Sequence, residues 1–390
     1  MKNEFLSLPP EEQTAVLEAA REINRPVIRK PSLHAVSMTE LFDMSFPPRT
    51  PVIEGLLYSG TYLFAGSPKI GKSFFMSQLG YHVATGKELW GYPVRKGSVL
   101  YLALEDDFGR LQGRLNTMFG VETVDGLFFA TQARTLTDGL NGQLEEFVQL
   151  HPDTRLIIVD TLQKVRELGN ESYSYSMDYQ NITALKAFSD AHNLAIIVVH
   201  HTRKLEASDS FDMISGTNGL LGAADGAFIL QKKKRTDPTA VMQVVGRDQP
   251  DQELTLEFSQ ENCVWELTKA ARPPVHREPE PLIKKIAVFM EDKEIWTGTA
   301  SELLEAIQCD DIKAHILSRK LNVGVSALFN DCGIIYTVNR RSSDRKTFTL
   351  RSIAGKEIQE ADDGNQMTHT GCEDTVIASL PSGTEYKQGG

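Results

Sequence analysis

The sequence predicts an α/β fold with a mainly parallel sheet, followed by a small domain of helices and a hairpin. Three observations predict it. Between Thr61 and about Phe258, short apolar runs alternate with helical stretches, and the runs are continuously apolar, as in strands covered on both faces. A glycine-rich turn follows the first run and opens a helix. The proline- and charge-rich segment 271–281 then separates a second unit.

Composition narrows the class of protein. At about 150 residues per domain, 390 residues predict two or three domains. No apolar run approaches the roughly 18 residues of a membrane span, and the N-terminus lacks the apolar core of a signal peptide, so we expect a cytoplasmic protein with no membrane partner. The net charge of −11 disfavours a uniformly basic nucleic-acid-binding surface, although a local basic patch is compatible with it.

The elements follow in order along the chain. A short amphipathic helix is predicted at Pro10–Ile23, within an N-terminal arm and linker over 1–50. The core domain, 51–268, has predicted parallel strands at Thr61–Ala65, Val99–Leu104, Leu156–Val159, Ala195–Val199 and Ala227–Leu230, a helix at Ser73–Thr85, and an antiparallel pair at Ala240–Val245 and Glu253–Phe258. A linker over 269–281, a second domain over 282–353 and a disordered acidic tail over 354–390 complete the chain.

One segment has a phosphate-binding pattern. The residues that fit G-x-x-x-x-G-K-[ST] are Gly66, Ser67, Pro68, Lys69, Ile70, Gly71, Lys72 and Ser73. The pattern lies between a predicted strand and a predicted helix, as the P-loop requires. Its two glycines let backbone amides approach a phosphate at a helix N-terminus, Lys72 is suited to the β- and γ-phosphates, and the Ser73 hydroxyl to Mg²⁺. The sequence therefore predicts a nucleotide site.

Carboxylates end two other predicted strands. Asp160 follows Leu156–Val159 and is the candidate for the Mg²⁺ site together with Ser73. Glu105 follows Val99–Leu104 and is the candidate base that activates water. The alternative role for either residue is to cap the helix that follows.

Two histidines, His200 and His201, end a further strand. A polar side chain there can hydrogen-bond the γ-phosphate and sense its loss, and His200 is the favoured candidate. A shared zinc site is disfavoured because adjacent strand residues point to opposite faces. The other histidine is expected to be structural.

The order of these motifs resembles RecA-fold ATPases, and most closely the RepA-like hexameric helicases and replication ATPases of plasmids, phages and integrative elements. The segments Ile53–Leu57, Gly66–Ser73, Ala103–Asp107, Leu156–Thr161 and Val198–Thr202 carry the resemblance. It implies a RecA-like core, ATP and Mg²⁺ as cofactors, an active site between subunits of a ring, and single-stranded DNA in the ring.

The resemblance also implies a cation supplied by the neighbouring subunit. RepA-like relatives tend to have an arginine just before the last core strand, where this chain has Asp225. Arg247, in a predicted hairpin turn, is the favoured substitute, and the basic turn 232–235 is the alternative. An ordinary surface role for Arg247 stays open.

The second domain resembles a winged helix-turn-helix. Predicted helices at 282–290, 296–307, 313–321 and 325–332 precede strands around 334–339 and 347–351, with Thr299 or Ser301 as a helix cap. Residues 312–351 contain eight cations and two acids, a net charge of +6. Such a patch suits duplex DNA, although charged hairpin tips are often plain solvated turns.

These observations lead to one expected function and one alternative. We expect an oligomeric Mg-ATP-hydrolysing replicative helicase of a mobile element, with the hexameric ring of the RepA-like family. The alternative is an ATP-gated adaptor or loader that unwinds no strand. A small-molecule kinase is disfavoured because the acidic strand ends and the histidine exceed what a kinase P-loop needs.

Overall fold

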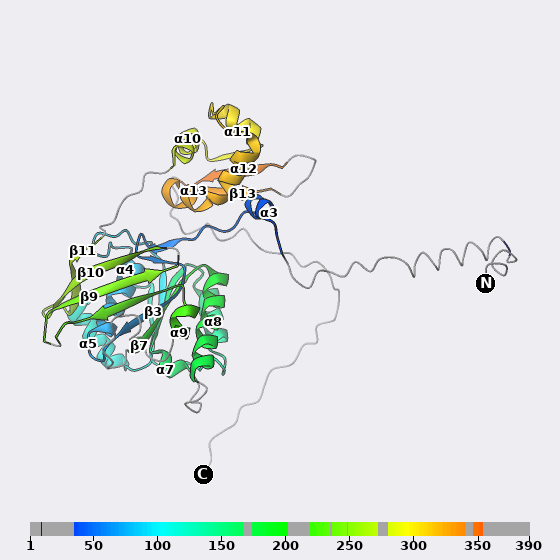
Figure 1. Ribbon diagram of the computed structural model, residues 1–390. Coiled ribbons are helices and arrows are strands. Elements are labelled where there is room, and N and C mark those ends of the chain that lie inside the picture. Colours follow the sequence, from blue (N-terminus) through cyan, green and yellow to red (C-terminus); the bar gives the residue numbers. More distant parts are fainter. Residues whose placement is uncertain are drawn as a thin grey trace, which may run out of the picture.

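The computed structural model describes residues 9, 35–166, 174–201, 218–234, 236–247, 249–271, 280–339 and 346–353. The predicted helix at 10–23, the loop 205–217 and the tail from 354 lie outside these residues. Within them, the chain forms a large α/β unit and a smaller C-terminal unit (Figure 1). Among the described residues, no helix has the length and hydropathy needed to span a membrane.

A nine-stranded sheet forms the centre of the large unit, in the order β11-β10-β9-β8-β3-β7-β6-β4-β5. The parallel strands are β3 (Gly60–Gly66), β4 (Ser98–Ala103), β5 (Leu127–Ala130), β6 (Thr154–Asp160), β7 (Ala195–His201) and β8 (Gly226–Gln231). Antiparallel strands β9 (Thr239–Gly246), β10 (Gln249–Ser259) and β11 (Val264–Ala270) extend one side. The prediction of a mixed α/β fold with a mainly parallel sheet is confirmed.

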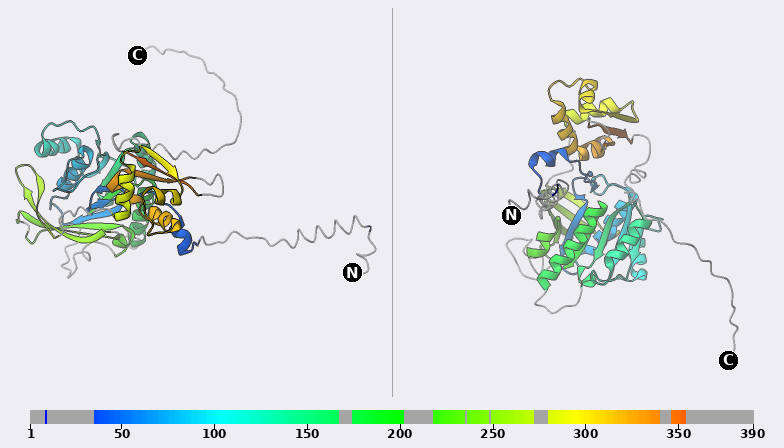
Figure 2. Two further views of the ribbon diagram at one scale, coloured as in Figure 1. Left: turned by 90° about the horizontal axis from the view of Figure 1, so that it is seen from above. Right: turned by 90° about the vertical axis from the view of Figure 1, so that its right-hand side faces the viewer.

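Helices cover both faces of this sheet (Figures 1 and 2). One face packs on α4 (Lys72–Thr85), α5 (Phe108–Phe119) and the small β1–β2 pair (Pro51–Ile53 and Leu57–Tyr58). The other packs on α6 (Leu140–Leu150), α7 (Leu162–Val165), α8 (Ser174–His192) and α9 (Asn218–Ala223). Successive strand residues enter opposite cores, Phe64 the first and Leu63 the second, which explains the continuous apolar runs.

The C-terminal unit has its own apolar core. Its elements are α10 (Pro281–Met290), β12 (Ile295–Gly298), α11 (Ala300–Ala306), α12 (Ala314–Val323), α13 (Val325–Cys332), β13 (Ile334–Val338) and β14 (Phe348–Ser352). The strands form an antiparallel sheet in the order β12-β14-β13. Thr299 caps α11 in a capping box with Glu302, as one of the two expected caps.

Two sequence predictions for strands and boundaries differ from the structure. Residues 296–298 were expected to open the helix that Thr299 caps, but they form β12, because they pair with β14 and complete the small sheet. The core domain extends beyond 268, because β11 pairs with β10 as far as Ala270.

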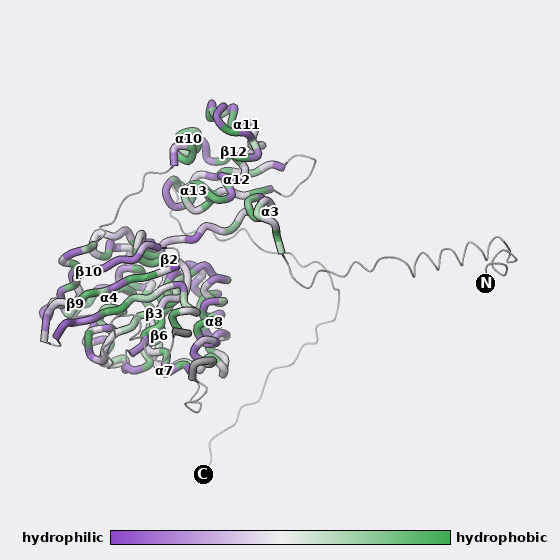
Figure 3. Tube along the Cα trace, viewed as in Figure 1, coloured by the Kyte–Doolittle hydropathy of each residue, from purple (hydrophilic) through white to green (hydrophobic). Residues whose placement is uncertain are grey.

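The segment before the sheet reaches the C-terminal unit. Helix α3 (Met38–Asp43) is capped by Ser37, whose hydroxyl accepts from the Glu40 amide. It packs on α12, and the chain then continues to β1 (Figure 1). We call residues 37–50 the strap. Figure 3 shows that α3 carries hydrophobic residues on its surface, and none of its residues is buried.

Candidate active site

The P-loop joins the centre of the sheet to α4. Strand β3, hydrogen-bonded to both β7 and β8, ends at Gly66, and α4 begins at Lys72. A Cβ atom on Gly66 would lie 2.9 Å from the Leu230 carbonyl oxygen, so this position accepts only glycine. Gly71, the N-cap of α4, has φ +108°, and a Cβ there would lie 3.0 Å from the Trp265 ring. The loop thus presents backbone amides at a helix N-terminus.

Lys72 folds back over this loop. Its Nζ donates to the carbonyl oxygens of Gly66 at 2.8 Å and Ser67 at 3.0 Å. Burial lowers the pKa of Lys72 to about 8, against the opposing charges of Asp160 and Glu105. Lys72 is therefore mostly protonated at neutral pH and close to its titration range.

The candidate metal ligands meet beside the P-loop. The Ser73 hydroxyl donates to Oδ2 of Asp160 at 2.8 Å, and the Tyr101 hydroxyl donates to the same oxygen at 2.8 Å. Burial raises the pKa of Asp160, while the bonds from Ser73 and Tyr101 lower it. Tyr101 holds one carboxylate oxygen in place without using the other.

Glu105 lies in the turn after β4, at the same edge of the sheet. Its Oε1 accepts from the Thr161 hydroxyl at 3.2 Å. Its Oε2 is 3.9 Å from Nε2 of His201. The Glu105 side chain is 43% exposed, so water reaches this carboxylate, unlike that of the buried Asp160. That arrangement suits a general base.

Of the two histidines, His201 makes the contacts at this edge. It pairs with Gly66 in the sheet register, and its Nδ1 is 3.0 Å from Nζ of Lys72. Burial and the Lys72 charge lower the pKa of His201, while nearby carboxylates oppose this. A neutral ring that accepts from Lys72 at Nδ1 has its proton on Nε2, toward Glu105. His200, the favoured candidate, precedes it and points to the opposite face of the sheet.

Sequence reasoning missed Trp265, which supports the P-loop. Its indole Nε1 donates to the Gly71 carbonyl oxygen at 3.2 Å, and its own backbone N and O bond to the Gln78 side chain of α4. The side chain is fully buried, and Phe258 packs on it edge to face. The sequence signal was weak because β11 is a short strand with mixed polarity at the sheet margin.

Arg247 lies far from the P-loop of its own chain. The end of β9, Gly246, pairs with Gly226, the first residue of β8. The P-loop residue Gly66 pairs with Leu230, toward the other end of β8. Arg247 is therefore at the opposite edge of the sheet and does not reach the P-loop in the same subunit.

Arg247 and Asp225 have local partners at that opposite edge. The Arg247 guanidinium donates to the Gly222 carbonyl oxygen. Asp225, where relatives would have an arginine, accepts from the Thr61 amide at 3.0 Å and pairs with Lys186 of α8. Asp225 thus ties α8 to the start of β3 and supplies no cation.

The basic turn lies at the P-loop edge instead. It follows β8, and Nζ of Lys232 lies 5.3 Å from the centre of the Trp265 ring. Lys233 and Lys234 follow it, while Arg235 is outside the described residues. The two candidate sources of the trans-acting cation thus lie at opposite edges of the sheet.

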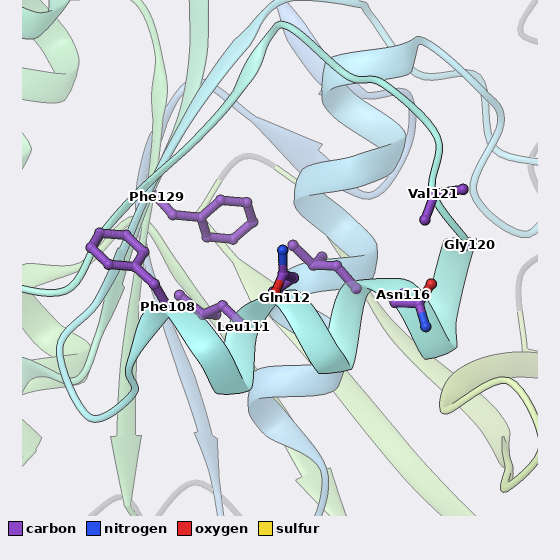
Figure 4. A pocket seen from close by; sticks show the side chains of 8 residues that line it. Phe108, Leu111, Gln112, Asn116, Gly120, Val121 and Phe129 are labelled. Atoms are coloured by element: carbon purple, nitrogen blue, oxygen red, sulfur yellow. The ribbon is translucent and has the colours of Figure 1, made fainter.

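A separate hollow of about 320 Å³ lies between α5 and β5 (Figure 4). Phe108, Leu111 and Phe129 line it, together with the polar side chains of Gln112 and Asn116. Its lining has no charged group and no P-loop residue, so it does not form part of the phosphate site.

The comparisons with known proteins add a family match. A family model described as an AAA domain matches residues 29–207. That range contains the P-loop, Glu105, Asp160 and both histidines. No curated protein matches.

Solved structures are similar at low identity. One, described as an isolated ATPase domain, has 14% identity and a TM-score of 0.46, over 67% of this chain and 100% of that chain. Another, "The Structure Of A DnaB-Like Replicative Helicase And Its Interactions With Primase", has 13% identity and a TM-score of 0.47, over 67% of this chain and 73% of that chain.

Proposed function

We propose that this chain is a Mg²⁺-dependent ATPase. The observation that carries the proposal is the convergence of Lys72, Ser73, Asp160, Glu105 and His201 at the end of the central parallel strands. Open α/β sheets bind ligands at this edge, where the strand order reverses, and β3 lies between β7 and β8 there. The AAA domain match over the same segments supports it.

The residues present fit Mg-ATP. Gly66 and Gly71 leave the loop without side chains where backbone approaches a phosphate, and Lys72 can exchange its carbonyl partners for phosphate oxygens. Ser73 and Asp160 supply the hard oxygen ligands that Mg²⁺ prefers. When bound, the metal neutralises charge on the phosphates.

The remaining two residues distinguish hydrolysis from binding. Glu105, exposed to water, takes the proton of the attacking water. His201, rather than His200, senses the γ-phosphate, because its ring lies between Lys72 and Glu105. A change in one of these groups therefore reaches the end of β7 directly.

The finer proposal is an oligomeric enzyme acting on DNA. Arg247, at the opposite edge of the sheet, suits a site on a neighbouring subunit, as in a RecA-like hexamer. The order of helices and strands in the C-terminal unit supports a winged helix that contacts DNA phosphates. A cytoplasmic replicative helicase of a mobile element, as in the RepA-like family, is the most specific form of this proposal.

A second candidate is an ATP-gated adaptor or loader. The C-terminal unit favours it, because a domain with its own core, outside the sheet, can recruit a partner without unwinding a strand. The two functions share the ATP site and differ in what ATP turnover does to DNA.

The test is ATP hydrolysis by the wild type with and without single-stranded DNA, with mass measured by light scattering in the same buffer. The helicase proposal expects DNA-stimulated turnover, a ring-sized species and unwinding of a tailed duplex. Turnover without stimulation or unwinding supports the adaptor. No ATP binding contradicts both.

A further inference from the structure

The exposed cations of α12 are held by carboxylates from outside the C-terminal unit's helical core. Nε of Arg319 donates to Oδ1 of Asp43, the last residue of α3, at 3.0 Å. Lys320, the next residue, pairs with Glu280, at the end of the interdomain linker. Each connection to the α/β unit thus brings one acid to this helix.

Asp43 is surrounded by positive groups of the C-terminal unit. Nζ of Lys346, just before β14, donates to the Asp43 main-chain oxygen at 3.2 Å. The hydrogen bond from Arg319 lowers the pKa of Asp43 most, and the charges of Lys346 and His315 lower it further. An anion is therefore favoured at this point whichever molecule supplies it.

The strap that delivers Asp43 is held only lightly. Besides the Asp43 contacts, the Asn322 amide donates to the Phe42 carbonyl oxygen at 2.9 Å. The Arg49 amide donates to the Ser326 hydroxyl, and Asn330 donates to the Arg49 carbonyl oxygen, each at 3.2 Å. No residue of α3 is buried, and a six-residue helix has little stability of its own. Such contacts can be exchanged for others.

We propose that Arg319, Lys346 and His315 form a binding site for nucleic-acid phosphates, and that the Asp43 carboxylate occupies it as an internal competitor. This rests on the proposed function, in which the C-terminal unit contacts DNA. A duplex that binds α12 must displace α3, so the strap reports DNA binding to β1 and the α/β unit. Arginine and lysine contacts to phosphate contribute through counterion release, so the competition depends on salt.

The test compares Asp43→Lys with wild type in the full chain, using anisotropy of a short labelled DNA duplex of mixed sequence at several salt concentrations. The matched control is Asp292→Lys, which makes the same charge change at an exposed residue after α10. We expect Asp43→Lys to tighten duplex binding about two- to five-fold more than the control, the scale of one exposed ion pair.

A double-mutant cycle separates unmasking from added charge. Arg319→Ala should weaken duplex binding, and in that background the gain from Asp43→Lys over Asp292→Lys should shrink toward none. Hydrogen exchange of the α3 amides should also speed up when duplex is added to the wild type.

Two results overturn this proposal alone: equal effects of Asp43→Lys and Asp292→Lys, or duplex binding that leaves α3 exchange unchanged. Absence of duplex binding by every variant at low salt contradicts DNA contact by the C-terminal unit, and this inference with it. Tight binding of an acidic peptide in place of DNA also contradicts it.

Discussion

The P-loop edge of the large sheet and the strap–α12 contact hold charged groups in opposite ways. At the edge, Lys72 and Asp160 are buried, and each has two or more partners from different strands and loops. At the strap, the side chains of Arg319 and Asp43 are 32% and 52% exposed. Buried charges are costly to leave without partners, whereas exposed pairs exchange easily with water and salt. The edge is built as a fixed site and the strap as a replaceable contact.

Lys72→Ala is expected to have the largest effect among the variants of this comparison. Loss of two charge-assisted hydrogen bonds to phosphate, at roughly 1.5 kcal/mol each, weakens Mg-ATP binding about 100-fold. Isothermal titration measures it. Lys69→Ala, an exposed lysine of the same loop, is the control and should change affinity little. Similar affinities for the two variants would mean that the edge is not the phosphate site.

The pH dependence of ATP binding sharpens the same point. Lys72 has a pKa lowered to about 8, and phosphates bind its protonated form, so affinity should fall as pH rises through 8, by about tenfold per pH unit at most. Binding above pH 8 should also take up a proton. Lys72→Arg stays charged and should lose this dependence whatever its affinity. A wild-type affinity constant up to pH 9.5 contradicts the account.

Tyr101→Phe tests how the metal site is held. It removes one of two donors to Oδ2 of Asp160, so we expect the Mg²⁺ concentration for half-maximal turnover to rise about three- to tenfold. ATP binding in EDTA should be unchanged. Tyr81→Phe, whose hydroxyl bonds Glu122 away from this edge, is the control. An equal shift in both variants would indicate a general loss of packing.

The smallest effect is expected at the strap. Arg319→Ala should leave the midpoint of urea unfolding unchanged within error, because its partner is exposed and the pair is screened by salt. A clear loss of stability would show that the strap is a fixed structural element, and the contrast between the two regions would fail.

The sequence predicted the P-loop edge better than the rest of the fold. The glycine pattern and the apolar runs ending in Asp160 and Glu105 are local signals, and parallel strands bring their carboxyl ends to one edge. The choice between His200 and His201 was not local. It depends on the phase of β7 against β3, which the sheet register sets.

Other features depended on pairing between distant segments. Strand β5 has four half-buried residues, and β12 is defined by its pairing with β14, so neither gives a strong periodic pattern. Trp265 reaches Gly71 only after the β9–β11 extension forms. The Asp43–Arg319 pair joins residues 276 apart in the chain, which no local spacing predicts.

Glu105→Gln tests most directly the central claim, that this edge hydrolyses ATP and does not merely bind it. Mg-ATP affinity and turnover should be measured on the same preparation, with the wild type beside it. The account predicts affinity within about threefold of wild type and turnover lower by about 10²- to 10⁴-fold, the contribution of a general base. Turnover close to wild type would contradict the role of Glu105 and leave the edge as a binding site alone.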